Sequence, residues 1–327
     1  MTRDTIGVAF IGAGTVAEMH GRGITAASNA RLIGAYDVGR SKAEGITTRF
    51  GGRVFDSLEQ LLADPDVDAV HVLTPVQHHV PNAVASMKAG KHVLLEKPIA
   101  ETPEDIALLK TVAQQTNRVC MPAHNYIYVP AIRRAKRLLE AGKLGNVGSL
   151  WILYNIFHSE QTASAYGGVL RAVCNHHAYS VLYLLGRPRR VMAMTSRVHY
   201  EKLACEDQAM IACEMENGSI ANLWCSFATS DPTNDPWTVV YKVLGTSGGV
   251  SYSWNEAQFK DDGGPAWGLP CYEEGFIGEI DHFINHCMLS GEQPLSTLDD
   301  AADALRILTA AERSVSKPET LEKIVFE

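Results

Sequence analysis

The feature that most constrains this chain is a glycine-rich turn near its N-terminus. The segment Gly12-Ala13-Gly14-Thr15-Val16-Ala17 follows the apolar run Ile6 to Ile11 and precedes a helical pattern. A G-x-G-x-x-G/A turn between a strand and a helix predicts a dinucleotide-binding unit. Gly12 permits the tight turn, Gly14 lets the backbone approach a pyrophosphate, and Ala17 lets the helix pack closely on the strand. The residues predicted to bind the cofactor here are Gly12, Ala13, Gly14, Thr15 and Val16.

An acidic residue follows this turn at the spacing that the motif requires. Asp37 lies 20 positions beyond Ala17, at the end of a second apolar run. A carboxylate there accepts hydrogen bonds from the adenine ribose and repels a 2'-phosphate, which favours NAD. Arg40, just beyond, could hold a 2'-phosphate, so NADP stays open as an alternative.

The first 121 residues alternate short apolar runs with helical stretches, a pattern typical of a parallel sheet with crossover helices. Ser57 with Gln60, and Thr102 with Asp105 and Pro103, predict helix starts. The expected strands are 6–11, 31–36, 53–55, 68–73, 91–95 and 118–121, and the expected helices are near 14–27, 41–50, 57–63, 78–89 and 102–115.

The loop after the fourth expected strand should contact the cofactor. Thr74 and Pro75 should line the cofactor crevice; His78 should approach the cofactor, and His79 should be exposed.

After Pro122 longer strand-like runs predominate, and Asn217-Gly218 is a hairpin signal between two of them. We expect a helix near 130–141, a helix near 174–185, two closing helices near 274–289 and 299–314, and strands at 147–157, 190–200, 208–215, 218–227 and 237–245. Residues 228–236 and 255–272 are expected to be loops. The predicted domains are therefore residues 1–122 and a mostly antiparallel α+β domain over 123–327.

Composition narrows the class of partner. The 327 residues are 46% hydrophobic and 20% charged, with a formal net charge of −8, which suits a globular protein and argues against nucleic-acid binding. With neither a secretory signal nor an apolar run long enough for a bilayer, a cytoplasmic protein with a small-molecule partner is expected. The seven cysteines contain no C-x-x-C pair, so reduced thiols and no metal site are expected.

A lysine follows the fifth predicted strand in Glu96-Lys97-Pro98. At the carboxyl edge of a parallel sheet its amine would reach the ligand crevice, and both Glu96 and Lys97 are expected to contact the cofactor. Oxidation of a secondary alcohol requires the hydroxyl proton to leave as the carbonyl forms. An amine beside that oxygen can accept the proton or stabilise the charge.

Together these motifs resemble the Gfo/Idh/MocA oxidoreductases over essentially the whole chain. The resemblance implies a Rossmann domain followed by an α+β domain with a large, open, mostly antiparallel sheet, and an activity on sugars, glycosides or cyclitols. It also implies that Lys97 is the catalytic lysine and that Asn125 binds substrate. The family often has arginine where this chain has Ile127.

The family usually carries Asp-x-x-x-His on a helix of the second domain. The spacing to Gly186 places His176 at the histidine and Ala172 at the aspartate, so the carboxylate is missing. His176 is predicted to be the second catalytic residue, with Asn175, His177 and His158 as substrate ligands. Three imidazoles at positions 158, 176 and 177 could form a zinc-type site, but no metal is assigned.

Three functions remain open at this stage. The first is an NAD(P)-dependent dehydrogenase acting on a CH–OH group, with Lys97 and His176 handling protons. The second is a lyase or hydrolase in which tightly bound NAD transiently oxidises a glycoside, and the third is a non-catalytic dinucleotide sensor. An open sheet with an uncovered apolar face further predicts a homodimer or homotetramer.

Overall fold

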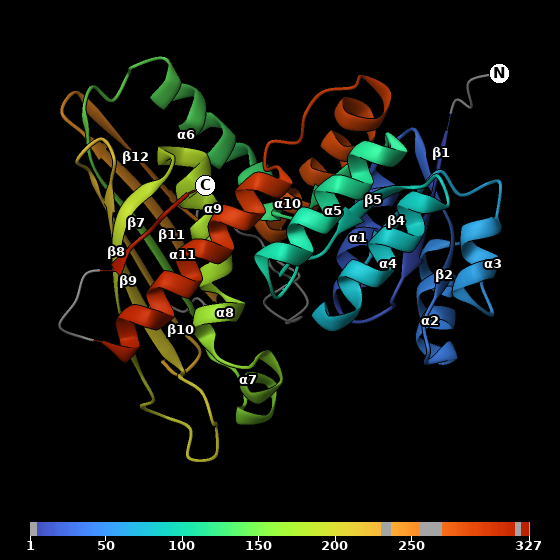
Figure 1. Cartoon of the computed structure of the whole chain (residues 1–327), viewed down its shortest axis with the longest axis horizontal. Helices are drawn as coiled ribbons and strands as arrows, with labels where there is room; N and C mark the ends of the chain where they lie inside the picture. Colours follow the sequence, from blue (N-terminus) through green and yellow to red (C-terminus); the bar gives the residue numbers. More distant parts are fainter. Residues whose placement is uncertain (1–4, 230–236, 255–269, 318–321, 327) are drawn as a thin grey trace. The chain divides into compact units, whose positions relative to one another are not determined.

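The computed structural model describes residues 5–229, 237–254, 270–317 and 322–326 (Figure 1). By its contacts the chain forms two compact units. The first contains Met1–Tyr128 with Glu273–Ala301, and the second contains Val129–Tyr272 with Ala302–Glu327. The division predicted at residue 122 assigns residues 273–301 to the second domain, whereas by contacts this segment groups with the first unit.

The first unit is built on a parallel sheet in the order β3-β2-β1-β4-β5-β6. The sequence order reverses between β1 and β4, and in such sheets ligands bind outside the carboxyl ends of the strands at that switch point. All six residues of β1 are buried, as a central strand covered on both faces requires. The strands are β1 (Ile6–Ile11), β2 (Ala30–Tyr36), β3 (Arg53–Val54), β4 (Ala69–Val72), β5 (His92–Leu95) and β6 (Cys120–Pro122).

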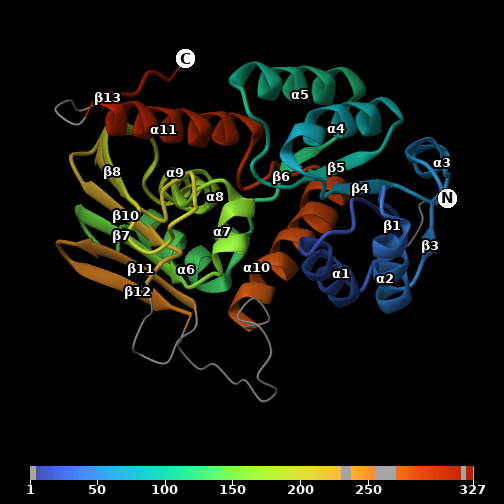
Figure 2. The same cartoon turned by 90° about the horizontal axis from the view of Figure 1, so that it is seen from below.

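Helices cover both faces of this sheet. Figure 2 shows α1 and α2 on one face and α4 and α5 on the other. The predicted caps are confirmed: Ser57 accepts a hydrogen bond from the backbone N–H of Gln60, and Thr102 accepts one from Asp105. The helices are α1 (Val16–Ala26), α2 (Arg40–Phe50), α3 (Leu58–Ala63), α4 (His79–Lys88) and α5 (Pro103–Thr116), with short 3-10 turns η1 (Val76–His78) and η2 (Asn125–Tyr128).

A helix from late in the sequence completes the first unit. α10 (Pro270–Asp281) continues into the π-helical segment η4 (His282–Leu289). The ring of Phe276 packs edge-on against His20 of α1, with centroids 5.3 Å apart. Gly278 lies so close to η2 that a Cβ atom there would be 2.8 Å from the carbonyl oxygen of Tyr128. This close packing explains why the segment groups with the first unit.

The second unit is built on a seven-stranded sheet in the order β12-β11-β7-β10-β9-β8-β13. Its neighbouring strands are antiparallel except for β7 and β10, which are parallel. The predicted fold class, a Rossmann domain followed by a mostly antiparallel sheet domain, is thus confirmed. The strands are β7 (Val147–Ile156), β8 (Pro188–Ser196), β9 (Gln208–Met215), β10 (Ile220–Ser226), β11 (Trp237–Gly245), β12 (Gly248–Ser253) and β13 (Glu322–Lys323).

The helices of the second unit lie on one face of its sheet (Figure 2). They are α6 (Pro130–Glu140), α7 (Glu160–Tyr166), α8 (Val169–Ala172), α9 (Cys174–Leu185) and α11 (Leu298–Ser316), the last of which begins in the first unit. On the other face, Leu153, Trp224, Met210 and Met194 are side by side in the strand register. In the part of the chain that the structure describes, no helix covers this apolar row.

Some predicted boundaries differ from the structure. The predicted hairpin at Asn217-Gly218 is confirmed, since Gly218 has a φ of +83° and donates to the carbonyl of Met215. Strand β12 and helix α7 were not predicted, because neither segment has strong hydrophobic periodicity. The predicted loops at 228–236 and 255–272 lie largely outside the described residues. No helix among the described residues is both long and apolar enough to cross a membrane.

The packing of α10 gives a test that compares two helical glycines. Gly278→Ala should destabilise the protein by about 1–2 kcal/mol, because its Cβ collides with the backbone of Tyr128. Gly45→Ala in α2 should stabilise it by about 0.5–1 kcal/mol, because nothing lies within 4 Å and alanine favours helix. Denaturant unfolding measures both changes. Equal stabilisation by the two substitutions would contradict the packing of α10.

Candidate active site

The predicted cofactor turn lies between β1 and α1, at the switch point of the first sheet. Gly12 has a φ of +96°, and a Cβ atom on it would be 2.8 Å from the carbonyl carbon and oxygen of Leu73. A Cβ on Gly14 would meet no atom within 4 Å. The absence of a side chain at Gly12 therefore allows the end of β1 to lie close to the end of β4. At Gly14 the absence of a side chain leaves open space at the start of α1. The helix cap Thr15 makes no side-chain capping bond.

Asp37 follows β2 and is held against this turn. Its Oδ2 accepts a hydrogen bond of 2.8 Å from the backbone N–H of Ala13, and its Oδ1 accepts one of 2.7 Å from Gly39. An ionised carboxylate has about four acceptor positions, so it retains capacity for ribose hydroxyls. Arg40 is engaged elsewhere, because its guanidinium is bonded to Glu44 and Asp56. These contacts suit an adenosine ribose without a 2'-phosphate.

The loop after β4 is tied to the loop after β5 by a histidine. His79 is 1% exposed, and its ring nitrogens lie 2.6 Å from the carbonyl oxygen of Thr74 and 2.8 Å from that of Pro98. The prediction that His79 is exposed is therefore wrong. Its ring turns inward because two partly buried backbone carbonyl groups bind its nitrogens there. His78 is exposed at the end of η1, and Pro75 precedes that turn as its N-cap.

Three buried polar side chains, those of His71, His20 and Glu96, form a series of contacts that ends at the backbone of Lys97. The Nδ1 atoms of His71 and His20 are 3.0 Å apart, and His20 Nε2 lies 3.1 Å from Glu96 Oε1. Glu96 Oε2 accepts a hydrogen bond of 2.8 Å from the backbone N–H of Lys97. Burial alone raises the pKa of Glu96, but the hydrogen bonds and charges of His20 and Lys97 outweigh it and lower the pKa. Glu96 is thus held as a carboxylate that fixes the backbone of Lys97.

A second buried carboxyl group lies near this series of contacts. Glu279 of α10 is 0% exposed, and neither of its oxygens has a hydrogen-bond partner. Burial, and then the charge of Glu96, raise the pKa of Glu279 well above its ordinary value. Both effects favour the neutral acid form of Glu279, as is usual when two carboxyl groups share a buried region.

Lys97 lies just beyond the carboxyl end of β5, as predicted. Burial lowers the pKa of its ammonium, and the carboxylate of Glu96 offsets this in part. A lysine with a lowered pKa can give up its proton more readily than a surface lysine, as a general acid or base requires. The charge of Lys97 also acts on buried His124, whose neighbour Asn125 is 3% exposed and begins η2.

In the second unit, His176 lies in the first turn of α9 and is 6% exposed. Its Nδ1 lies 2.5 Å from the hydroxyl oxygen of Tyr179, and its backbone carbonyl accepts a hydrogen bond from Ser180. Ala172 ends α8 and offers no polar group. The phenol of Tyr179 is thus a polar partner of the imidazole in a position where Ala172 supplies none.

The other histidines predicted in this unit differ in their surroundings. His158 lies at the end of β7, packs on Phe227 with centroids 4.9 Å apart, and lines a hollow of about 470 Å³ with His199 and Glu160. Asn175 is 6% exposed. His177 is fully buried against Tyr154, so its position gives no support to a substrate contact.

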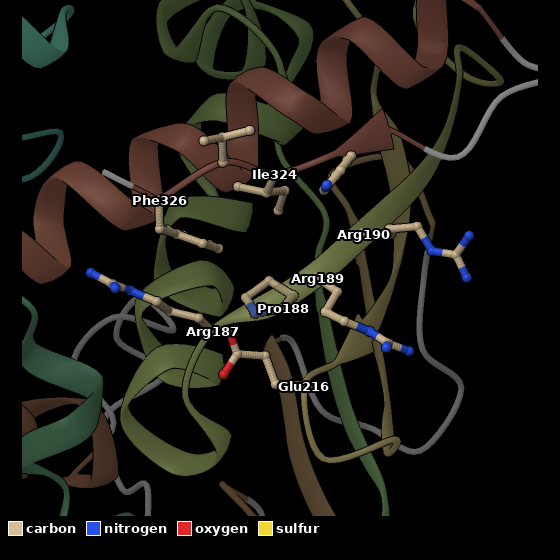
Figure 3. Close-up of a pocket in the computed structure, with 9 residues that line it drawn as sticks. Arg187, Pro188, Arg189, Arg190, Glu216, Ile324 and Phe326 are labelled. Carbon is tan, nitrogen blue, oxygen red and sulfur yellow. The ribbon is translucent and has the colours of Figure 1, made fainter.

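A second hollow, of about 580 Å³, lies at the edge of this sheet beside β8 and β13. Figure 3 shows that the side chains of Arg187, Arg189 and Arg190 point in different directions rather than toward one centre. Arg187 is bonded to Asp303, and both Arg189 and Arg190 are bonded to Glu214. This hollow therefore lacks the convergent donors of an anion site.

Comparison with known proteins agrees with this geometry. Residues 6–124 match the oxidoreductase family model with an NAD-binding Rossmann fold, and residues 132–251 match the GFO/IDH/MocA C-terminal domain. The chain belongs to the GFO/IDH/MocA oxidoreductase family, as predicted. It is an oxidoreductase whose first domain is an NAD-binding Rossmann domain.

Individual relatives show how far the likeness extends. Over 250 residues the chain is 27% identical to 1,5-anhydro-D-fructose reductase of Ensifer adhaerens, covering 74% of each protein. Over 326 residues it is 25% identical to scyllo-inositol 2-dehydrogenase (NAD(+)) of Bacillus subtilis strain 168, covering 94% of this chain and 93% of that protein. The fold also matches levoglucosan dehydrogenase, solved in complex with NADH and levoglucosan, with a TM-score of 0.84, 20% identity, and coverage of 98% and 99%.

Several residues near the predicted site were missed by sequence reasoning. Tyr179 is three positions after His176, which places both on one helix face, and this spacing could have identified it. The sequence did not indicate the contacts of His20 and His71, because the residues around a buried histidine do not reveal which distant side chain it contacts. Glu279 lies far from Glu96 in the sequence, so only the fold brings them into one unit.

Burial of neutral histidines in the first unit predicts a stability that depends on pH. Burial lowers the pKa of His124 to about 3 and that of His92 to about 4. Between these values and the ordinary pKa near 6.5, the unfolded chain binds more protons than the folded one, so stability falls as pH falls. His124 alone should contribute a loss of about 2 kcal/mol between pH 7 and pH 5.

Denaturant unfolding at pH 7 and pH 5 measures this loss. His124→Asn should reduce the difference between the two pH values, whereas substitution of the exposed His78 by Asn should leave it unchanged. A wild-type unfolding free energy that is equal at both pH values would contradict the burial of these imidazoles in neutral form.

Proposed function

We propose that the chain is an NAD-dependent dehydrogenase that oxidises a hydroxyl group of a sugar, glycoside or cyclitol. One observation carries the proposal. Lys97, with a pKa lowered by burial, lies in the same unit as the Gly12 turn and is fixed by the buried Glu96–His20 pair. The relatives named above act on a sugar derivative and a cyclitol, which supports this substrate class.

The residues of the first unit fit NAD. Gly14 leaves space beside the start of α1 for a pyrophosphate, and Asp37 retains acceptor capacity for ribose hydroxyls. Ala13, Thr15, Val16, Thr74, Pro75 and His78 complete the proposed cofactor contacts. A 2'-phosphate would meet the Asp37 carboxylate, and Arg40 is already paired, so we propose NAD rather than NADP. NAD, when bound, supplies the hydride acceptor.

Lys97 and His176 are the proposed proton-handling residues. An amine with a lowered pKa accepts the hydroxyl proton or stabilises the developing charge on the oxygen. The Tyr179 hydroxyl sets the orientation and tautomer of His176 in place of the absent carboxylate. Asn125, Asn175 and His158 are proposed to hold other hydroxyls of the substrate.

Substitution of the lysine tests this role. Lys97→Met should lower kcat by about 10³-fold, because general acid–base groups contribute factors of this order. NADH affinity measured by fluorescence should change by less than about threefold, since NADH binding depends mainly on the glycine turn. Substitution of the exposed Lys88 of α4 by Met is the matched control. Full turnover by Lys97→Met would refute the assignment.

Removal of the tyrosine hydroxyl tests the orientation of His176. Tyr179→Phe should lower kcat by about 10-fold and shift the pH profile of kcat/KM, because the imidazole loses the partner of its Nδ1. Tyr183→Phe on the same helix should change neither quantity. Kinetics and a pH profile identical to those of the wild type would show that the contact is only structural.

We also propose that the chain forms a homo-oligomer through the open face of its second sheet. Trp151, Met194 and Ile220 lie on that face and are 51%, 57% and 52% exposed. Apolar residues gathered in one patch to this extent usually mark an interface. A two-fold contact would bury the same patch of both subunits.

Light scattering on the purified chain tests this interface. The wild type should have the mass of a dimer or tetramer at micromolar concentration, and the double variant Trp151→Glu, Met194→Glu should shift toward the monomer. Leu289→Glu, at an exposed apolar residue of the first unit, should not. A monomeric wild type would contradict the proposal.

A further inference from the structure

Three side chains that suit a metal ion gather inside the second unit, apart from the residues proposed for catalysis. Cys174 and His177 lie in the first turn of α9, three positions apart, and Cys225 lies on β10. One ligand atom from each, two sulfurs and an imidazole nitrogen, lie within 4.8 Å of one another. All three side chains are 0% exposed. A helix and a neighbouring strand thus bring together groups that are 51 positions apart in the sequence.

The contacts of these groups leave a need for a ligand. Neither ring nitrogen of His177 has a hydrogen-bond partner, although both are buried. Buried polar atoms are almost always satisfied, so each exception calls for an explanation such as an ion. The sulfur atoms of Cys174 and Cys225 are 3.0 Å apart. An ion bound to both sulfurs and to one ring nitrogen of His177 would engage all three groups at once, leaving only the second ring nitrogen of His177 without a partner.

We propose that Cys174, His177 and Cys225 bind one divalent soft metal ion, of which zinc is the expected example. Thiolate and neutral imidazole are the ligands that zinc prefers. Two thiolates and one Zn²⁺ sum to zero charge, which lowers the cost of burying these charges. On binding, each thiol releases its proton, so two protons leave as two zinc–sulfur bonds form.

The geometry requires only a small adjustment. Zinc–sulfur bonds of about 2.3 Å at a tetrahedral angle place two sulfurs about 3.8 Å apart. A rotation of either cysteine side chain that moves its sulfur by less than an ångström gives this spacing. Three protein ligands leave a fourth position for a water molecule. The bound ion would fasten the first turn of α9, which also carries His176, to β10.

A disulfide between the two cysteines explains less. It would join the sulfurs but leave both nitrogens of His177 without partners, as they are now. Direct thiol–thiol contact has the same defect. The metal is therefore the occupant that accounts for all three residues.

Metal content of the 327-residue chain, purified without chelator, is the first measurement. Elemental analysis should find about one zinc ion per chain. His177→Phe and Cys225→Ser should each lower that content at least 10-fold. Cys120→Ser, which changes a buried thiol of β6 in the first unit, should leave it unchanged.

Wild-type protein stripped by chelator gives a second readout that does not depend on the folding of variants. Titration with Co²⁺ should produce a thiolate-to-metal charge-transfer band, and Zn²⁺ should raise the melting temperature by about 5 °C or more. Calorimetry in buffers of different ionisation enthalpy should show about two protons released per zinc ion. Absence of metal in the purified protein, together with no response to Co²⁺ or Zn²⁺, would overturn the proposal. So would a mass lower by two hydrogens that reductant restores, because it would identify a Cys174–Cys225 disulfide.

Discussion

The close approach of Gly12 to the backbone of Leu73 and Thr74 is the constraint on which the site depends. With φ at +96° and the carbonyl carbon and oxygen of Leu73 2.8 Å from a would-be Cβ, no other residue fits without moving the end of β4. Because β1 and β4 are the strands at which the order of the sheet reverses, this contact fixes the two strand ends at the switch point. Asp37, bonded to the N–H of Ala13, fixes the other side of the same turn.

Polar groups then connect this turn to the backbone around Lys97. His79 connects the carbonyl of Thr74 to that of Pro98, while Glu96 binds His20 and the backbone of Lys97. His79, His20 and Glu96 are buried and would be costly to leave unsatisfied, so these contacts favour one arrangement of the β4 and β5 ends. The lowered pKa of Lys97 is a consequence of that burial.

Local signals predicted much of this fold and part of the site. The Gly12 turn, the Ser57 and Thr102 caps and the Asn217-Gly218 hairpin each depend on adjacent residues, and the structure contains all of them. What could not be predicted depends on distant contacts. His79 binds backbone carbonyl groups of two loops, one of them after β5. Helix α10 packs on η2, which is far from it in the sequence. Cys174 contacts Cys225 only because α9 packs beside β10. Catalytic roles for Lys97 and His176 stay predictions.

The central claim is that this family member oxidises a sugar-like hydroxyl with net transfer of hydride to NAD. Absorbance of NADH during incubation with NAD and a panel of sugars, glycosides and cyclitols tests it most directly, with NADP in parallel. The account predicts stoichiometric NADH with at least one member of the panel, and faster formation with NAD than with NADP. Product formed without net NADH, or no NADH from any member by a chain that binds NAD, would contradict it.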